Sequence, residues 1–397
     1  MTANALKICF LCHKYPPTIG GGIGSVVRTT ARLLVKMGHE VRVIGMPARD
    51  KSQPAYEEDE GVRVWRMYPG KSRLGYWGRL ALRRYQLFRQ CAQWAKRGEI
   101  DLIEAPDYEG PVAGWPGLKI PVIVRLHGTH TFLLKDIGED PARSMYRLEN
   151  WGLQRADSLN APSRYVMEET RNLFPSLQKK PMRVLYNTIP VPTTFEQRNR
   201  NRWRVVYSGS LHVRKGVIPL MQAWPAVVKA FPAAELHLYG KDSVYEGSSM
   251  RERLASMVPP ECAGTVTFHG HIARPLLEEP LRTARVCIFP SYAESFCVAP
   301  VEAMAAGSPT IFTTRCTGRE IIEDGKSGLL IDPDDIRSIT DAIIRMLQDD
   351  QLAEKCAVAG YERARDLFSI TSLLPQFVEY YAASIQEFKR ARNGGAR

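Results

Sequence analysis

Residues 289–307 read FPSYAESFCVAPVEAMAAG, and this stretch decides the fold of the last third of the chain. An apolar run that is typical of a buried strand ends at Phe289, and a Pro-Ser turn and a tight loop follow it. A helix then runs to Gly307, since glycine is a common residue at a helix end. Glu294 falls on the loop and Glu302 one turn or more into the helix, so the two carboxylates flank a helix N-terminus.

This arrangement suits a ligand that carries both phosphate and sugar. The free N–H groups and partial positive charge of a helix start favour an anion such as a diphosphate. A carboxylate can accept two hydrogen bonds from the vicinal diol of a ribose or a hexose. Two solvated glutamates beside a packed helix would show the same spacing, so Glu294 and Glu302 need support from the rest of the chain.

The length and composition predict a soluble protein with two domains. A chain of 397 residues exceeds one ordinary core, and 44% hydrophobic and 24% charged residues are typical of globular proteins. No apolar run is long enough to span a bilayer, and the first residues lack the apolar core of a signal peptide, so we expect a cytoplasmic protein. The eight cysteines are scattered, which favours reduced thiols over a disulfide framework.

One short motif points to a different chemistry. Cys9-Phe10-Leu11-Cys12-His13 matches the C-x-x-C-H pattern of c-type haem attachment. Haem attachment of this type requires export, for which the sequence carries no signal, and the same residues end an apolar run that is typical of a buried strand. We therefore interpret the motif as part of the core and expect no cofactor.

Most of the net charge of +12 comes from one segment. No acidic residue lies between Gly61 and Gly98, whereas lysines and arginines recur throughout. Apolar and aromatic residues recur at helical spacing over 74–96, which fits either an interfacial membrane helix or a core-packed helix with solvated arginines. We expect an anionic membrane surface as a partner and, without a matching motif, no nucleic acid. The residues expected at the membrane are Arg79, Arg83 and Arg84.

The first half of the chain begins with a unit of the doubly wound type. A buried strand over 6–12 leads into a loop with glycines at 20–22 and 24. A helix is expected from Ser25 to Met37, followed by a strand over 41–45. Glycines let the backbone approach a ligand closely. The loop is neither a P-loop nor a G-x-G-x-x-G motif, which argues against a dehydrogenase.

His127 follows a second buried strand, over 121–126. Open α/β sheets place their ligand contacts at the carboxyl ends of parallel strands. This position favours a functional histidine over a turn residue with a purely structural role.

A polar, proline-rich linker precedes a second series of strands and helices that starts near Trp203. Its first loop carries Arg214 and Lys215 just before a helix. Two cations at the positive end of a helix dipole are unfavourable unless an anion lies between them, so this pair favours diphosphate binding. Asp332-Pro333-Asp334 resembles a metal motif, but its place between a strand and a helix favours a turn and an N-cap, and we expect no metal.

Together these features resemble the retaining glycosyltransferases of family 4, over nearly the whole chain. The resemblance implies the GT-B fold, in which two Rossmann-like doubly wound domains face each other across a cleft and the final helix crosses back to the first domain. The implied division is an acceptor-side domain over 1–190, a linker over 191–202, a nucleotide-sugar-binding domain over 203–372, and a returning helix with a tail over 373–397. The matching residues are the 20–24 loop, His127-Gly128, Asn187, Arg214-Lys215-Gly216, Glu294-Ser295-Phe296, Glu302, 305–309, 320–322 and 324–330.

The resemblance also implies roles for individual residues. Glu302 would bind the ribose diol and Glu294 the hydroxyls of the transferred sugar. Arg214 and Lys215 would neutralise the diphosphate, and His127 would contact the sugar near its anomeric carbon. The backbone groups that would approach the donor are the N–H groups of Phe296, Cys297 and Val298 and the glycines Gly21 and Gly22.

The chain departs from the family pattern at three places. Cys297 stands where glycine is frequent, which predicts a tighter sugar pocket. Gly209-Ser210 replaces a frequent Gly-Arg, so Ser210 would sit at the phosphates, and Arg214 would have to replace the missing arginine or leave one phosphate oxygen without a cation. Residues 316–319 are less glycine-rich than usual, so this loop could accept a different donor.

The implied reaction is transfer of a hexose-type sugar from a UDP- or GDP-sugar to a hydroxyl of a glycan or lipid-linked acceptor, with retention and without a metal ion. Synthesis of surface polysaccharide or glycolipid at the inner face of the membrane would fit the basic segment. Two alternatives stay open. One is a nucleotide-sugar epimerase or hydrolase of the same fold, and the other is a nucleotide-sugar-binding protein without catalysis.

Overall fold

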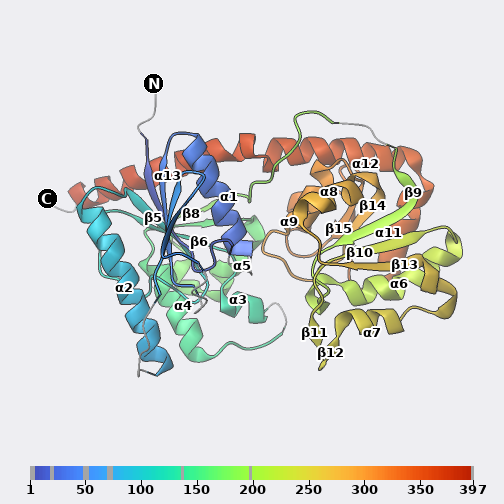
Figure 1. The fold of residues 1–397 in the computed structure, drawn as a ribbon, viewed down its shortest axis with the longest axis horizontal. Coiled ribbons are helices and arrows are strands. Elements are labelled where there is room, and N and C mark those ends of the chain that lie inside the picture. The colour runs from blue at the N-terminus through green and yellow to red at the C-terminus, as the bar shows by residue number, and fades with distance from the viewer. Residues whose placement is uncertain are drawn as a thin grey trace. The chain divides into compact units, whose positions relative to one another are not determined.

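The computed structural model describes residues 5–17, 22–47, 53–68, 75–135, 138–195 and 199–394. The chain divides into two compact units, which are Met1–Thr188 with Leu373–Arg397, and Ile189–Ser372. In each unit helices pack around one sheet of mostly or wholly parallel strands (Figure 1). This architecture confirms the α/β fold with two Rossmann-like units that alternating strands and helices predict.

The eight-stranded sheet of the first unit has the order β3-β4-β2-β1-β5-β6-β7-β8. Of its described strands, only β3 runs antiparallel, against β4. The central strands β5 and β6 are buried along their whole length, in agreement with the apolar run VIV of β6. The sequence missed β3, because its residues YEED have low strand propensity. The strands are β1 (Lys7–Leu11), β2 (Glu40–Gly45), β3 (Tyr56–Asp59), β4 (Val62–Arg66), β5 (Leu102–Pro106), β6 (Val122–Arg125), β7 (Ser158–Ala161) and β8 (Met182–Val184).

The first helix of this unit starts earlier than its expected first residue. It begins at Gly22 instead of Ser25, so two of the glycines expected in the loop, Gly22 and Gly24, lie in the helix. Gly21, which belongs to that loop, lies outside the described residues. The helices that follow the strands are α1 (Gly22–Lys36), α2 (Tyr76–Lys96), α3 (His130–Lys135), α4 (Arg143–Arg155) and α5 (Arg164–Leu173).

Helix α2 differs most from its prediction. Its later turns face the core as the spacing predicts, whereas Trp77 in the first turn is half exposed and lines a surface hollow together with residues of α4. Arg84, expected at a membrane, is buried, and its guanidinium donates to the carbonyl oxygens of Glu109 and Gly110. The expectation for Arg84 is therefore wrong, because this side chain satisfies buried carbonyl groups instead of facing a lipid.

The C-terminal helix α13 (Ile370–Gly394) returns to the first unit, as predicted. The Tyr381 hydroxyl donates to the Glu104 carboxylate on β5 at 2.9 Å, and Tyr380 shares a hydrogen bond with Ser158. The helix continues to Gly394, where Arg392 donates to the Leu118 carbonyl, so helical structure extends into the expected tail. Neither α13 nor any other helix in the described part of the chain is long and apolar enough to cross a membrane.

The six-stranded sheet of the second unit is parallel throughout, in the order β13-β10-β9-β14-β15-β16. Trp224 on α6 is fully buried in its core. The elements are β9 (Asn201–Ser208), α6 (Val217–Ala230), β10 (Glu235–Tyr239), β11 (Val244–Tyr245), β12 (Ser248–Ser249), α7 (Met250–Ser256), β13 (Val266–Gly270), α8 (Arg274–Thr283), β14 (Ala284–Phe289), α9 (Val298–Ala305), β15 (Thr310–Thr313), α10 (Gly318–Ile321), β16 (Leu329–Ile331), α11 (Ile336–Gln348) and α12 (Asp350–Arg363).

The C-x-x-C-H stretch lies at the end of β1. Cys9 and Cys12 are buried, and burial raises the pKa of the Cys12 thiol to about 12. His13 Nδ1 accepts a hydrogen bond from the Met46 N–H at 3.0 Å. These side chains therefore have roles within the folded core, as the sequence interpretation expects.

The contact between Tyr381 and Glu104 predicts a measurable share of the stability of the first unit. Tyr381→Phe removes a buried hydroxyl donor to a carboxylate, so we expect the free energy of unfolding to fall by about 1–3 kcal/mol in urea titrations followed by circular dichroism. Tyr380→Phe is the matched control, because its hydroxyl contacts the neutral Ser158 and should contribute about 1 kcal/mol. An unchanged stability in Tyr381→Phe would contradict this role.

Candidate active site

The residues singled out in the second unit meet where the order of its strands reverses. From β9 the chain proceeds through α6 to β10 on one side, whereas β14 lies on the other side of β9. Loops that leave such neighbouring strands diverge and open a crevice at their carboxyl ends, where open α/β sheets bind ligands. Arg214 and Lys215 follow β9, and Glu294 follows β14.

Glu294 is the centre of this group. Its side chain is buried, and its carboxylate pairs with the Lys215 ammonium and lies 3.7 Å from the Arg214 guanidinium. Burial alone would lower the pKa of Lys215, but the charge of Glu294 and its hydrogen bond outweigh burial and raise it. Two cations and one anion leave a net positive charge beside the start of α6, which favours an anionic ligand.

Backbone contacts hold the two loops together. Gly216 adopts a left-handed conformation with φ of 69°, and a side chain there would collide with the carbonyl oxygen of Pro290. The Tyr292 N–H donates to the Arg214 carbonyl at 2.9 Å, and the Arg214 guanidinium donates to the Ala293 carbonyl at 2.7 Å. The cation pair is therefore fixed in place by main-chain atoms.

The start of α9 carries the three backbone positions expected to contact the donor. Phe296 is buried edge-on against Phe368, and its carbonyl accepts a hydrogen bond from the Thr317 hydroxyl. Cys297 has φ of 56°, a left-handed conformation that is strained for a residue with a side chain. Val298 is the first residue of α9, and the side chain of the preceding Cys297 makes no capping hydrogen bond. Pro300 has no N–H group, so Val298 and Ala299 carry the N–H groups of this helix start that an anion could meet.

Glu302 and Ser210 lie on either side of this group in the sequence. Glu302 is on α9, as predicted, and its carboxylate pairs with Arg274 of α8. Burial raises the pKa of Glu302, and the charge of Arg274 opposes that rise. Ser210 is exposed after β9, and its carbonyl accepts a hydrogen bond from the Tyr207 hydroxyl at 2.8 Å.

In the first unit, His127 lies at the carboxyl end of β6, where the sequence predicts it. Asp107, which follows β5, accepts hydrogen bonds from the His127 and Gly128 N–H groups at 2.9 and 3.0 Å. Burial, aided by the charge of Arg125, lowers the pKa of His127 to about 3. The imidazole is therefore neutral at physiological pH and can act as a hydrogen-bond donor or acceptor. Gly22 is exposed at the first position of α1.

Sequence reasoning missed two buried carboxylates that fix this region. Asp107 follows a strand just as His127 does, so the same rule about strand ends could have found it. Glu149 is fully buried on α4 and accepts hydrogen bonds from the His130 and Thr131 N–H groups. No local pattern distinguishes Glu149 from a solvated helical glutamate, because its partners are N–H groups at the start of another helix, α3.

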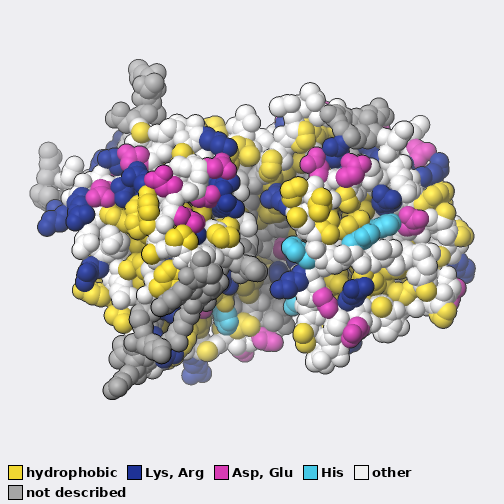
Figure 2. All heavy atoms as spheres, in the orientation of Figure 1, with side chains coloured by type: hydrophobic (Ala, Val, Ile, Leu, Met, Phe, Trp, Pro, Cys, Tyr) yellow, Lys and Arg dark blue, Asp and Glu magenta, His cyan; other side chains and the backbone are white. Residues whose placement is uncertain are grey.

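Metal ligation has little support in the described residues. They contain no group of three or more His, Cys, Asp or Glu side chains that could hold a metal ion. Asp332 and Asp334 both pair with Arg315, and Asp335 caps α11. Histidine side chains are exposed on the second unit (Figure 2), where His237 and His269 form a hydrogen bond of 2.9 Å.

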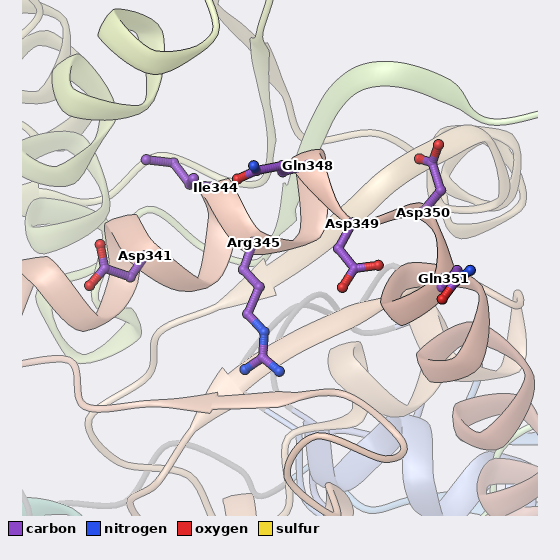
Figure 3. A pocket seen from close by; sticks show the side chains of 7 residues that line it. All are labelled: Asp341, Ile344, Arg345, Gln348, Asp349, Asp350 and Gln351. Atoms are coloured by element: carbon purple, nitrogen blue, oxygen red, sulfur yellow. The ribbon is translucent and has the colours of Figure 1, made fainter.

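A surface hollow of about 590 Å³ lies at the end of α11 and the start of α12, away from these residues in the sequence (Figure 3). Asp349 caps α12, and Asp350 pairs with Arg285, which also donates to the Met346 carbonyl at the end of α11. These side chains stabilise helix ends, which gives the hollow a structural explanation.

Comparisons with known proteins agree with this geometry. Residues 202–349 match the family model described as glycosyl transferases group 1, and residues 20–191 match that of glycosyltransferase family 4. A phosphatidyl-myo-inositol mannosyltransferase of Mycobacterium leprae is 23% identical over 96% of this chain and 98% of its own.

Two solved structures share the fold. Sucrose-phosphate synthase from Thermosynechococcus elongatus gives a TM-score of 0.78 at 22% identity, over 95% of this chain and 98% of that one. Anabaena HepE, solved with UDP and glucose, gives 0.70 at 18% identity, over 95% and 99% of the two chains. Both likenesses span the two units of this chain and establish its overall fold.

Asp107 predicts a distinct pH dependence of stability. Burial raises its pKa from 3.8 to about 7, and the like charge of Glu149 adds to this rise. The carboxyl of Asp107 therefore contributes stability that is fully present below about pH 4 and is lost as the pH rises through 7, on the order of 4 kcal/mol in total. Asp107→Asn cannot ionise and should abolish this loss, in urea titrations at a series of pH values.

The test depends on how the difference in the free energy of unfolding changes with pH, because Asp107→Asn also changes two hydrogen bonds at every pH. Wild type should lose stability relative to this variant between pH 4 and pH 8. The exposed Asp140→Asn variant keeps Asp107, so the difference in stability between wild type and this control should not change over that range. A constant difference between wild type and Asp107→Asn would refute the raised pKa.

Proposed function

Because the chain belongs to the group 1 glycosyltransferases of family 4, we propose that it transfers a hexose from a UDP- or GDP-sugar, with retention at the anomeric carbon. The proposed acceptor is a hydroxyl of a glycan or a lipid-linked glycan, in the synthesis of surface polysaccharide or glycolipid. The observation that carries the proposal is the placement of Arg214 and Lys215 around the buried Glu294.

The second unit is proposed to bind the donor. Arg214 and Lys215 would hold the diphosphate together with the free N–H groups at the start of α9. Glu294, already oriented by Lys215, would accept hydrogen bonds from the sugar hydroxyls. Glu302 would accept them from the ribose diol, and Ser210 would lie near the phosphates.

The charge arrangement supports a retaining mechanism driven by leaving-group stabilisation. As the bond between the anomeric carbon and the phosphate oxygen breaks, negative charge develops on the diphosphate, where Arg214 and Lys215 would stabilise it. The departing oxygen would take the proton of the acceptor hydroxyl on the same face of the sugar, so no strong base is needed. His127, which is neutral, would serve as a hydrogen-bonding group and not as a general acid. Two side-chain cations could supply the charge that a metal ion gives in other transferases.

The relatives support the choice of substrates. HepE was solved with UDP and glucose, which is consistent with a UDP-hexose donor. The mycobacterial relative is named for mannosyl transfer to a phosphatidylinositol, which is consistent with a lipid-linked acceptor. A lipid-linked acceptor would place the enzyme at the cytoplasmic face of a membrane.

A donor screen and product analysis test this proposal. UDP- or GDP-hexoses should raise the melting temperature, because a ligand that binds only the folded state stabilises it. NMR of the product should show the anomeric configuration of the donor, and EDTA should leave the rate unchanged. An inverted linkage, or donor turnover that needs no acceptor, would contradict the proposed reaction.

The role of Lys215 gives a second test. Lys215→Met removes one of the two cations and should lower kcat by about 10²–10³, the usual effect of losing one group that stabilises transition-state charge. Leu276→Ala, at an exposed site on α8, is the control and should keep full activity. Calorimetry with UDP would separate donor affinity from catalysis. A kcat equal to that of wild type would exclude Lys215 from leaving-group stabilisation.

A further inference from the structure

Helices α2 and α4 of the first unit flank a shallow hollow of about 250 Å³. Its walls are two indole rings that remain half exposed, Trp77 at 50% and Trp151 at 57%. The Trp151 ring packs against Gly114, which holds it in place. The hollow is lined by Trp77, Ser144, Arg147, Leu148 and Trp151.

Another exposed aromatic side chain lies beside the hollow. Tyr76 on α2 is exposed by 51%, and its ring packs edge-on against Trp77 with a centroid distance of 5.2 Å. Trp77, Trp151 and Tyr76 form what we call the aromatic patch. Apolar groups gathered on a surface in this way commonly mark an interaction site.

The charged side chains exposed on α2 and α4 are all of one sign. Helix α2 contains no acidic residue, and the single acid of α4, Glu149, is fully buried against backbone N–H groups. Arg143 and Arg147 are exposed on α4, and neither forms an ion pair with any residue that the structure describes. Arg79 and Arg89 are exposed on α2. Exposed acids flank α4 in the sequence at Glu139, Asp140 and Asp157, and of these Asp140 pairs with Lys135 and Asp157 with Arg155.

We propose that this face of the first unit binds the surface of a bilayer that contains anionic lipid. Tryptophan and tyrosine prefer the zone between lipid headgroups and acyl chains, because their rings are apolar and their N–H or O–H groups are polar. Arginine pairs with lipid phosphate while its stem lies along apolar surface. Trp77 and Trp151 anchor the protein among the headgroups, and Arg143 and Arg147 contact the phosphates.

A sugar ring could stack on the same indoles. A neutral glycan, however, would not explain why α2 and α4 expose arginines and no acidic side chain. Charge complementarity therefore favours the anionic bilayer. The inference rests on the proposed function in one respect: a lipid-linked acceptor would explain why the enzyme binds a membrane. The arginines proposed to contact lipid now include Arg143 and Arg147, which are exposed, and no longer include Arg84, which is buried.

Vesicle sedimentation with the full-length protein tests the proposal. The probes are vesicles of phosphatidylcholine alone and of phosphatidylcholine with phosphatidylglycerol. Wild type should bind the anionic vesicles, and its tryptophan fluorescence should shift to the blue and be quenched by brominated acyl chains. Each arginine contributes about a five-fold gain in binding to an anionic surface, so Arg143→Ala with Arg147→Ala should weaken it by about twenty-five-fold. Trp77→Ala with Trp151→Ala should weaken binding and remove the quenched signal.

Leu276→Ala with Val244→Ala, two exposed apolar sites of the second unit, is the matched control and should bind as wild type does. The melting temperature with a UDP- or GDP-hexose, measured on every variant, reports folding and donor binding separately from lipid binding. Loss of vesicle binding in the patch variants with an unchanged donor response would support the proposal. Three results would overturn it: no binding of wild type to anionic vesicles, binding unaffected in both patch variants, or a fluorescence response to soluble oligosaccharide with none to vesicles.

Discussion

The ion pair between Glu294 and Lys215 determines how the loops after β9 and β14 pack at the carboxyl end of the sheet of the second unit. A buried carboxylate is costly unless cations or hydrogen-bond donors surround it, so the loop after β14 can take this shape only beside the loop after β9. The strand order makes that possible, because β9 and β14 are neighbours and their connections leave in opposite directions. The same interaction that stabilises the loops therefore assembles the charges proposed to meet the diphosphate.

The first unit uses buried carboxylates in a different way. Asp107 and Glu149 accept hydrogen bonds from main-chain N–H groups, and they fix the loop that carries His127 without a direct cation partner. The cost of burying Asp107 appears as a pKa of about 7. Glu104 is also buried but is held by Tyr381, so the C-terminal helix contributes to the core of a unit far from it in sequence. Loop position in this unit therefore depends on polar contacts between distant segments.

Hydrophobic periodicity predicts the buried strands from the sequence, and the rule about strand ends predicts which residues lie at the carboxyl edge of the sheet. Buried parallel strands read as continuous apolar runs, and β1, β6 and β14 lie where such runs predict them. The grouping of Arg214 and Lys215 with Glu294 followed from the combination of a loop, a helix start and charge. Helical spacing left two interpretations of α2 open, because it reports which residues share a face and not which part of that face other elements cover; Trp77 in the first turn is half exposed. Arg84 and Glu149 could not be assigned, because their partners are main-chain atoms of other segments.

The loop between β14 and α9 shows how stability and binding are linked at such a site. Cys297 holds a left-handed conformation that costs on the order of 1–3 kcal/mol, and strain of this kind persists only where the surroundings determine the backbone. Those surroundings are present on both sides, since the Phe296 carbonyl is held by Thr317 and its ring by Phe368. Upstream, Lys215 holds Glu294. Because the loop is ordered in advance by these contacts, a ligand would not have to spend binding energy on ordering it, and more of that energy would remain for the charge that develops in the transition state.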